Sequence, residues 1–213
     1  MKISKFVQTA KNTGQCIVIH AAGEIYLSNG NAIYKASELP NMNGKSQIAA
    51  VLDIEPKKLK KITIMETSYT SRDDICGYDL SDGTTVGEME IEKMETAAVV
   101  NGNIYAAFRC NNGEITFFSE DLLAPIKDRI KDESTYTSYA ARTHAKGFKY
   151  IIIKDGFEVL AAILPVKILN EDYMDNLRIF YDKCCSQYNL EQMREHAELE
   201  EMNIPEAEAE NNE

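Results

Sequence analysis

The sequence lacks the long apolar runs that membrane spans require. No run approaches about 20 residues, and no apolar signal region lies near the N-terminus. Paired cysteines are also missing, because the five cysteines are odd in number and no Cys-x-x-Cys motif occurs. We therefore expect a cytoplasmic protein with reduced cysteines, no membrane association and no disulfide framework.

The motifs of common catalytic sites are absent as well. The sequence contains no G-x-x-x-x-G-K-[ST] phosphate loop, no G-x-G-x-x-G, no G-x-S-x-G and no H-E-x-x-H. The three histidines, His20, His144 and His196, stand far apart, and we expect His20 to be a packed or edge residue of a strand and not a ligand. These absences predict a protein that is not an enzyme, with no catalytic residue, no metal and no cofactor.

One basic cluster surrounds a histidine. His144 lies in a predicted loop with Arg142, Lys146 and Lys149. This cluster has two interpretations, a contact with phosphate or a hairpin whose charged side chains are solvated.

Negative charge is concentrated at the C-terminal end of the chain. The whole chain carries −11, and residues 189–213 contain nine acidic residues and one arginine. The remaining 188 residues therefore carry only −3. The body is close to neutral and the tail makes the protein acidic.

The first part of the chain alternates helical and strand patterns. Apolar spacing predicts short helices over residues 3–12 and 56–62, the second with a proline at its first position. Strands are expected over residues 16–21, 24–28, 32–36 and 63–69, and residues 47–54 form either a strand or a helical turn. Residues 71–95 are expected to be a connection with one or two edge strands.

The central part of the chain has the order strand, helix, three strands. Strands over residues 96–100, 103–110 and 114–118 precede Ser119, a good helix N-cap. A helix over residues 120–132 should follow, with Pro125 shortening or bending it. Three strands are then expected over residues 135–143, 148–154 and 157–165, and Asp155-Gly156 predicts a two-residue hairpin between the last two.

The pattern changes after residue 168. Helical spacing over residues 169–204 predicts a long C-terminal helix, with a possible break near Asn189. Residues 205–213 are so rich in glutamate that we expect a disordered acidic tail.

Two segments of the body resemble each other. Asn29-Gly-Asn-Ala-Ile-Tyr-Lys-Ala36 is similar to Asn101-Gly-Asn-Ile-Tyr-Ala-Ala107. Either this similarity arose by chance, or the body is duplicated. The second interpretation divides it into a first βα-unit (1–70), a connection (71–95) and a second βαβββ unit (96–168).

Basic residues are concentrated on the predicted body helices. These helices and their flanks hold ten bases and five acids, a balance of +5 in an acidic protein. Either they form a phosphate-binding face or they only solvate amphipathic helices. For the first interpretation the candidate DNA-binding residues are Lys5, Lys11, Lys57, Lys58, Lys60, Lys61, Lys127, Arg129 and Lys131.

The segment 114–168 resembles the βαβββ unit that ends a bacterial sliding clamp. A strand enters a short leucine-rich helix, three strands follow, and the last ends in Leu164-Pro165-Val166-Lys167-Ile168. The resemblance implies an α+β fold of mostly antiparallel sheets with short helices on one face. It also implies a partner-peptide site at Leu164, Pro165, Val166 and Ile168, and a ring around double-stranded DNA made of two or more chains.

Two functional hypotheses remain open at this point. In the first, the protein is a non-enzymatic, sliding-clamp-like homo-oligomer that associates with the DNA backbone and tethers replication or other DNA-processing proteins. In the second, the same fold is a protein-interaction module that acts through its acidic C-terminal extension without binding DNA.

Overall fold

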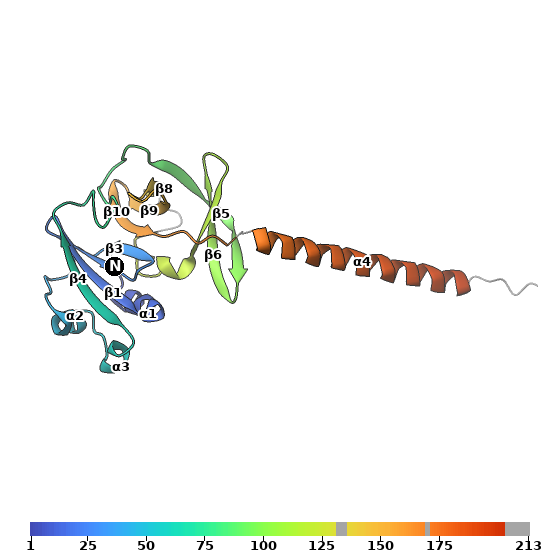
Figure 1. Ribbon diagram of the computed structural model, residues 1–213, viewed down its shortest axis with the longest axis horizontal. Coiled ribbons are helices and arrows are strands. Elements are labelled where there is room, and N and C mark those ends of the chain that lie inside the picture. The colour runs from blue at the N-terminus through green and yellow to red at the C-terminus, as the bar shows by residue number, and fades with distance from the viewer. Residues whose placement is uncertain (131–135, 169–170, 203–213) are drawn as a thin grey trace, which may run out of the picture. The chain divides into compact units, whose positions relative to one another are not determined.

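The computed structural model describes residues 1–130, 136–168 and 171–202 of the chain. It divides the chain into two units, Met1–Val166 and Lys167–Glu213. The first unit contains all the strands of the described residues, and the second contains one long helix (Figure 1). The expected disordered tail, residues 205–213, lies outside the described residues.

The first seven elements follow the sequence pattern closely. Helix α1 ends at Gly14, whose φ of 74° provides the left-handed cap that glycine adopts most readily. The segment that could have been a strand or a helical turn is helix α2. The elements are α1 (Ile3–Thr13), β1 (Gln15–Ala21), β2 (Glu24–Ser28), β3 (Ala32–Lys35), α2 (Lys45–Val51), α3 (Pro56–Leu59) and β4 (Thr63–Tyr69).

The second half of the unit consists almost entirely of strands. The predicted hairpin is confirmed, but its two-residue turn lies one residue later than expected. Asp155 pairs with Glu158 in the antiparallel strands, and the turn consists of Gly156, at a φ of 61°, and Phe157. The elements are β5 (Met89–Val100), β6 (Asn103–Cys110), β7 (Ile115–Ser119), the 3-10 helix η1 (Glu120–Leu123), β8 (Thr137–Thr143), β9 (Lys149–Asp155) and β10 (Glu158–Ile163).

All ten strands belong to one sheet with the order β4-β1-β2-β3-β10-β9-β8-β5-β6-β7. Strand β10 pairs with β3 and so joins the two halves of the sequence. Only β1 and β4 are parallel among these pairs, and helices α2 and α3 lie between them in the chain. The predicted α+β fold with a mostly antiparallel sheet is confirmed. The sequence suggested divisions at residues 70 and 95, whereas Met1–Val166 is one unit.

The predicted connection, residues 71–95, is only partly irregular. Residues 71–88 contain no helix or strand, apart from an isolated bridge between Ile75 and Tyr78. Strand β5 begins at Met89 and lies inside the sheet between β8 and β6, so the expectation of edge strands was wrong. The strands at the sheet edges are β4 and β7.

The predicted helix over residues 120–132 was also wrong in type. Only the four residues of η1 are helical, and turns continue to Arg129. Pro125 explains the difference, because proline lacks the N–H that an α-helix needs and its ring obstructs the preceding turn. The apolar side chains of Leu122, Ile126 and Ile130 are nevertheless buried, as the helical spacing required.

The two faces of the sheet are covered by different segments. One core cluster contains Phe6 of α1, Ile48 of α2 and Ile126 from the turns after η1. The other contains Ile75 and Leu80 from residues 71–88. The expectation of short helices on one face is therefore confirmed for α1 and α2.

The second unit contains helix α4 (Glu171–Met202). It is 32 residues long and continuous, without the break that Asn189 suggested. No helix among the described residues is long and apolar enough to cross a membrane.

Candidate functional site

The candidate DNA-binding residues do not share one environment. Lys57, Lys60 and Lys61 are exposed and make no ion pair with any described residue, whereas Lys58 pairs with Glu55 at 3.1 Å. Further exposed candidates are Lys5 on α1 and Lys127 after η1, and Lys11 is half-buried. Lys131 lies outside the described residues.

Arg129 is occupied by contacts within the fold. Its Nη2 lies 2.7 Å from Glu158 and 3.4 Å from Asp155. Two carboxylates neutralise this guanidinium, and a phosphate would have to compete with both. Arg129 is therefore a poor DNA contact, although the sequence grouped it with the exposed lysines.

Three of the four candidate partner-binding residues line a groove of about 420 Å³. Leu164, Pro165 and Val166 form one wall, and the Val166 N–H donates to the carbonyl of Phe117 at 2.7 Å. The fourth candidate, Ile168, belongs to the other unit, Lys167–Glu213, and is not among the residues that line the groove. Asparagines and threonines supply much of the remaining lining, namely Thr9, Asn12, Thr13, Asn29, Asn31 and Asn103.

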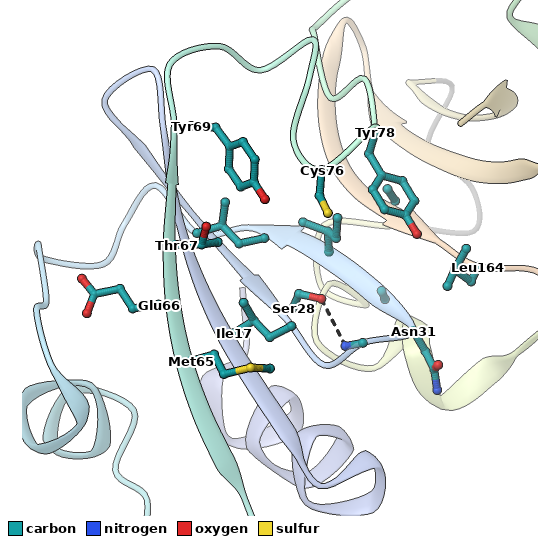
Figure 2. A pocket seen from close by; sticks show the side chains of 15 residues that line it. Ile17, Ser28, Asn31, Met65, Glu66, Thr67, Tyr69, Cys76, Tyr78 and Leu164 are labelled. Carbon is teal, nitrogen blue, oxygen red and sulfur yellow. Dashed lines mark hydrogen bonds between the residues drawn. The ribbon is translucent and has the colours of Figure 1, made fainter. Parts of the chain in front are cut away.

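A second cavity, of about 340 Å³, lies on the other side of the sheet. Its side chains come from β1, β2, β3, β4 and β10, and from residues 71–88 (Figure 2). Most of the lining is apolar. Of the cavity residues only Leu164 was a candidate from the sequence, as a partner-binding residue. The alternation of Met65, Thr67 and Tyr69 along β4 was a signal that these three share one face.

Residues 71–88 are anchored by a buried charged cluster. Arg142 on β8 is 2% exposed and donates to the carbonyls of Asp79, Ser81 and Gly83 at 2.9 Å each. Its Nε also donates to Glu88 at 2.8 Å, and Glu88 pairs with Lys154 of β9. Burial alone would raise the pKa of Glu88, but hydrogen bonds from Lys154 and Arg142 outweigh it and lower that pKa.

The same segment is held by His144. This side chain is 5% exposed, and its Nε2 lies 2.9 Å from the carbonyl of Cys76. The His144 ring also stacks on Phe148 and contacts Tyr78 edge-on. The two interpretations of this basic cluster, phosphate contact and solvated hairpin, are both wrong for Arg142 and His144, because both side chains are buried against residues 71–88.

A second charged cluster links β2, β3 and β10. Lys35 Nζ lies 3.0 Å from Glu24 and 3.2 Å from Glu158. Asp82 lies 3.9 Å from the same Nζ and accepts from Arg72 at 2.7 Å. Burial would raise the pKa of each carboxyl group, but hydrogen bonds and nearby cations outweigh it and lower the pKa values. The largest lowering contributions come from the Tyr26 hydroxyl at Glu24, the Val159 N–H at Asp82 and Arg129 at Glu158, followed by Lys35 and Arg72.

This cluster predicts loss of stability in acid. The folded-state pKa values of Glu24, Asp82 and Glu158 lie below the ordinary values of 4.5, 3.8 and 4.5. Their contribution is therefore complete above about pH 5 and is lost as the pH falls through the lower folded values. We expect the urea midpoint to be constant from about pH 7 to 5 and to fall below about pH 4.5. The Lys35→Met variant should show a weaker acid dependence, and an unchanged dependence would contradict this assignment.

Comparison with known proteins finds no family model, no curated protein and no solved structure that matches this chain. The resemblance to sliding clamps therefore stays a prediction. Among the described residues, no group of three or more His, Cys, Asp or Glu side chains could hold a metal ion.

Helix α4 exposes large apolar side chains along most of its described length. One row has the spacing three, four, three, four, which keeps its members on one helical face. The row consists of Met174, Leu177, Tyr181, Cys184 and Tyr188. Its large side chains are 47–66% exposed. We call these five residues the α4 row.

The position that continues the α4 row beyond Tyr188 is acidic. Glu191 follows three residues later on the same face. Over Glu171–Met202 the helix carries nine acidic residues and three basic ones, a net charge of −6. The helix therefore combines an apolar row with strong negative charge.

Proposed function

We propose that this protein is a protein-interaction module whose α4 row docks into an apolar groove bordered by basic residues on a partner protein. The exposure of the α4 row carries this proposal. Soluble proteins rarely leave contiguous large apolar side chains in water unless a partner covers them. An amphipathic helix laid in a groove is a common way of covering them.

Charge decides which kind of partner fits best. A second copy would bring together two helices that each have a net charge of −6, and their repulsion would oppose pairing. Lysines and arginines beside a groove would instead attract the helix and orient it, with the strongest attraction toward Glu191 and the acidic residues that follow. The acidic residues 206–213 add to the same field.

The first test uses a synthetic four-heptad peptide with leucine at a and d and lysine at e and g. We expect it to bind the full-length protein in a fluorescence anisotropy titration, and to bind less tightly as salt is added. Leu177→Asp with Tyr181→Asp removes two apolar anchors at roughly 1.5 to 3 kcal/mol each, so affinity should fall at least about tenfold.

A matched variant controls for charge and helix propensity. Ile179→Asp with Leu190→Asp adds the same charge and also replaces two exposed apolar side chains, but away from the α4 row. We expect this control to bind as the unaltered protein does. Equal losses in both double variants would contradict the proposal, and a stable dimer by light scattering would show that a second copy covers the row.

We also propose a second function, association with the DNA backbone through the lysines of residues 57–61. The observation that favours it is that Lys57, Lys60 and Lys61 are exposed and carry no internal ion pair in the described part of the chain. In the sliding-clamp interpretation the same residues would face DNA. The groove at Leu164, Pro165 and Val166 would then receive peptides of replication partners.

DNA association predicts a steep salt dependence. If about four lysines contact phosphates, affinity for a duplex should fall roughly a hundredfold for a fourfold increase in salt. Reversing Lys57, Lys60 and Lys61 to Glu should abolish binding, as measured by anisotropy of a labelled duplex. Reversing Lys146, Lys167 and Lys183 changes the net charge equally and should have a much smaller effect. Equal effects of both triple variants would reject a contact at residues 57–61.

A further inference from the structure

The cavity of about 340 Å³ has the size of a small-molecule site. Ile17 and Ile19 of β1 and Ala162 of β10 contribute side chains from strands inside the sheet. Met65, Thr67 and Tyr69 of β4 line it on one side. Cys76 and Tyr78 approach from residues 71–88 (Figure 2).

The segment carrying Cys76 and Tyr78 is fixed in place. Cys76 has a φ of 56°, a conformation that residues other than glycine seldom adopt, and its carbonyl contacts His144. The Ala145 N–H donates to the Gly77 carbonyl at 3.0 Å. A Cβ on Gly77 would lie 2.6 Å from His144 Cε1, so the close contact requires glycine there. The cavity is therefore formed before any ligand arrives.

No charged side chain described in the lining faces the cavity. Glu66 is the one charged residue among them, and its side chain points away in Figure 2. Its carboxylate accepts the Gly44 N–H at 2.9 Å and lies 3.4 Å from His20 Nε2. A charged ligand would lose its hydration without gaining an opposite charge, so the cavity favours uncharged molecules.

The polar side chains that remain are hydroxyls, a thiol and the amide of the exposed Asn31. The Tyr78 hydroxyl has no hydrogen-bond partner among the described residues, and its ring is held edge-on to His144 and Tyr150. Burial raises the pKa of Tyr78, and the adjacent Cys76 thiol raises the pKa of Tyr69. Both hydroxyls therefore keep their protons at neutral pH and can donate to a ligand.

We propose that this cavity binds a small uncharged aromatic molecule that accepts a hydrogen bond from Tyr78. The Met65 thioether and the rings of Tyr69 and Tyr78 favour an aromatic ring over an aliphatic chain, because sulfur and tyrosine rings make additional contacts with aromatic groups. The apolar residues Ile17 and Ile19 exclude further polar groups from the buried end of the ligand. This site is separate from the α4 row and does not depend on the proposed function.

The test uses 2-naphthol as the probe and 2-naphthoate as its charged counterpart. By isothermal titration calorimetry on the full-length protein, we expect 2-naphthol to bind at least about tenfold more tightly than 2-naphthoate. Tyr78→Phe should weaken 2-naphthol binding about fivefold, since one hydrogen bond is lost. Thr67→Phe fills the cavity and should abolish binding, while Ser68→Phe, on the opposite face of the same strand, should not.

Chemical modification places the probe in the cavity. Cys76 and Cys184 are both exposed, and Cys184 on α4 is the internal control. Saturating 2-naphthol should slow alkylation of Cys76 by iodoacetamide at least about fivefold, followed by mass spectrometry, and should leave Cys184 unchanged. Equal affinity for both probes, binding that survives Thr67→Phe in a variant that melts as the unaltered protein does, or unprotected Cys76 would each overturn the proposal.

Discussion

Replacing Glu88 with alanine should lower the free energy of unfolding by about 3 to 5 kcal/mol, because it leaves the buried Lys154 without its carboxylate and leaves Arg142 with Asp79 alone, at 3.6 Å. The side chains of Glu88 and Lys154 are each 6% exposed, and that of Arg142 is 2% exposed. Arg142 keeps its three carbonyl partners after the change, but Lys154 loses its ion pair with Glu88. Urea unfolding followed by circular dichroism measures the effect.

A neighbouring glutamate provides the matched control. Glu90 lies two residues further along the chain and is exposed. Glu90→Ala changes the net charge equally and should alter stability by less than about 0.5 kcal/mol. If the two variants are equally stable, the ion pairs of Glu88 contribute nothing and residues 71–88 are held by other contacts.

Replacing Phe108 with alanine should cost a similar amount, about 3 to 5 kcal/mol. Phe108 on β6 is fully buried, stacks on Phe118 with ring centroids 4.6 Å apart, and contacts Tyr139 of β8. Its removal leaves a cavity where β6 and β7 pack against Tyr139 of β8. The change tests whether β5, β6 and β7 belong to the same cooperative core as the first half of the sheet.

Ile104→Ala on the same strand is the control for strand propensity. Ile104 is 48% exposed, so its truncation should cost much less than that of Phe108. A single urea transition with a lower midpoint is expected for Phe108→Ala. Two separate transitions would contradict one cooperative unit over Met1–Val166.

Local chemistry was sufficient to predict most of the strands. Gly156 was sufficient to predict the hairpin between β9 and β10, since the turn needs a positive φ that glycine provides, although the turn is Gly156-Phe157 and not Asp155-Gly156. The alternation of residues in β1 and β4 reflects their burial in the same direct way. The prediction of a helix over residues 120–132 was wrong, because successive turns bury Leu122, Ile126 and Ile130 as well as a helix would have done.

Sheet order and the buried charges could not be predicted, because both depend on residues far apart in the chain. The parallel pairing of β1 with β4 and the antiparallel pairing of β3 with β10 have no local signal. Arginine and histidine are typical of a solvated hairpin. Arg142 and His144 are nevertheless buried, and they contact backbone carbonyls of residues 76–83. The cavity beside Cys76 was missed for the same reason.

The exposed row on α4 was visible in the sequence only as helical spacing. The sequence predicted the helix and the spacing of its apolar residues, but not which of those side chains are exposed on the helix. Tyr181 and Tyr188 are more than 60% exposed, and this exposure is the reason that we consider the row a candidate interface.

Hydrogen–deuterium exchange of the full-length protein, with and without the basic leucine peptide, tests the central claim most directly. The account predicts that the peptide slows exchange in residues 174–188 and leaves β1 to β10 unchanged. The Leu177→Asp and Tyr181→Asp double variant should lose this protection. Protection confined to the body, or none along α4 at a saturating peptide concentration, would contradict the assignment of α4 as the interaction surface.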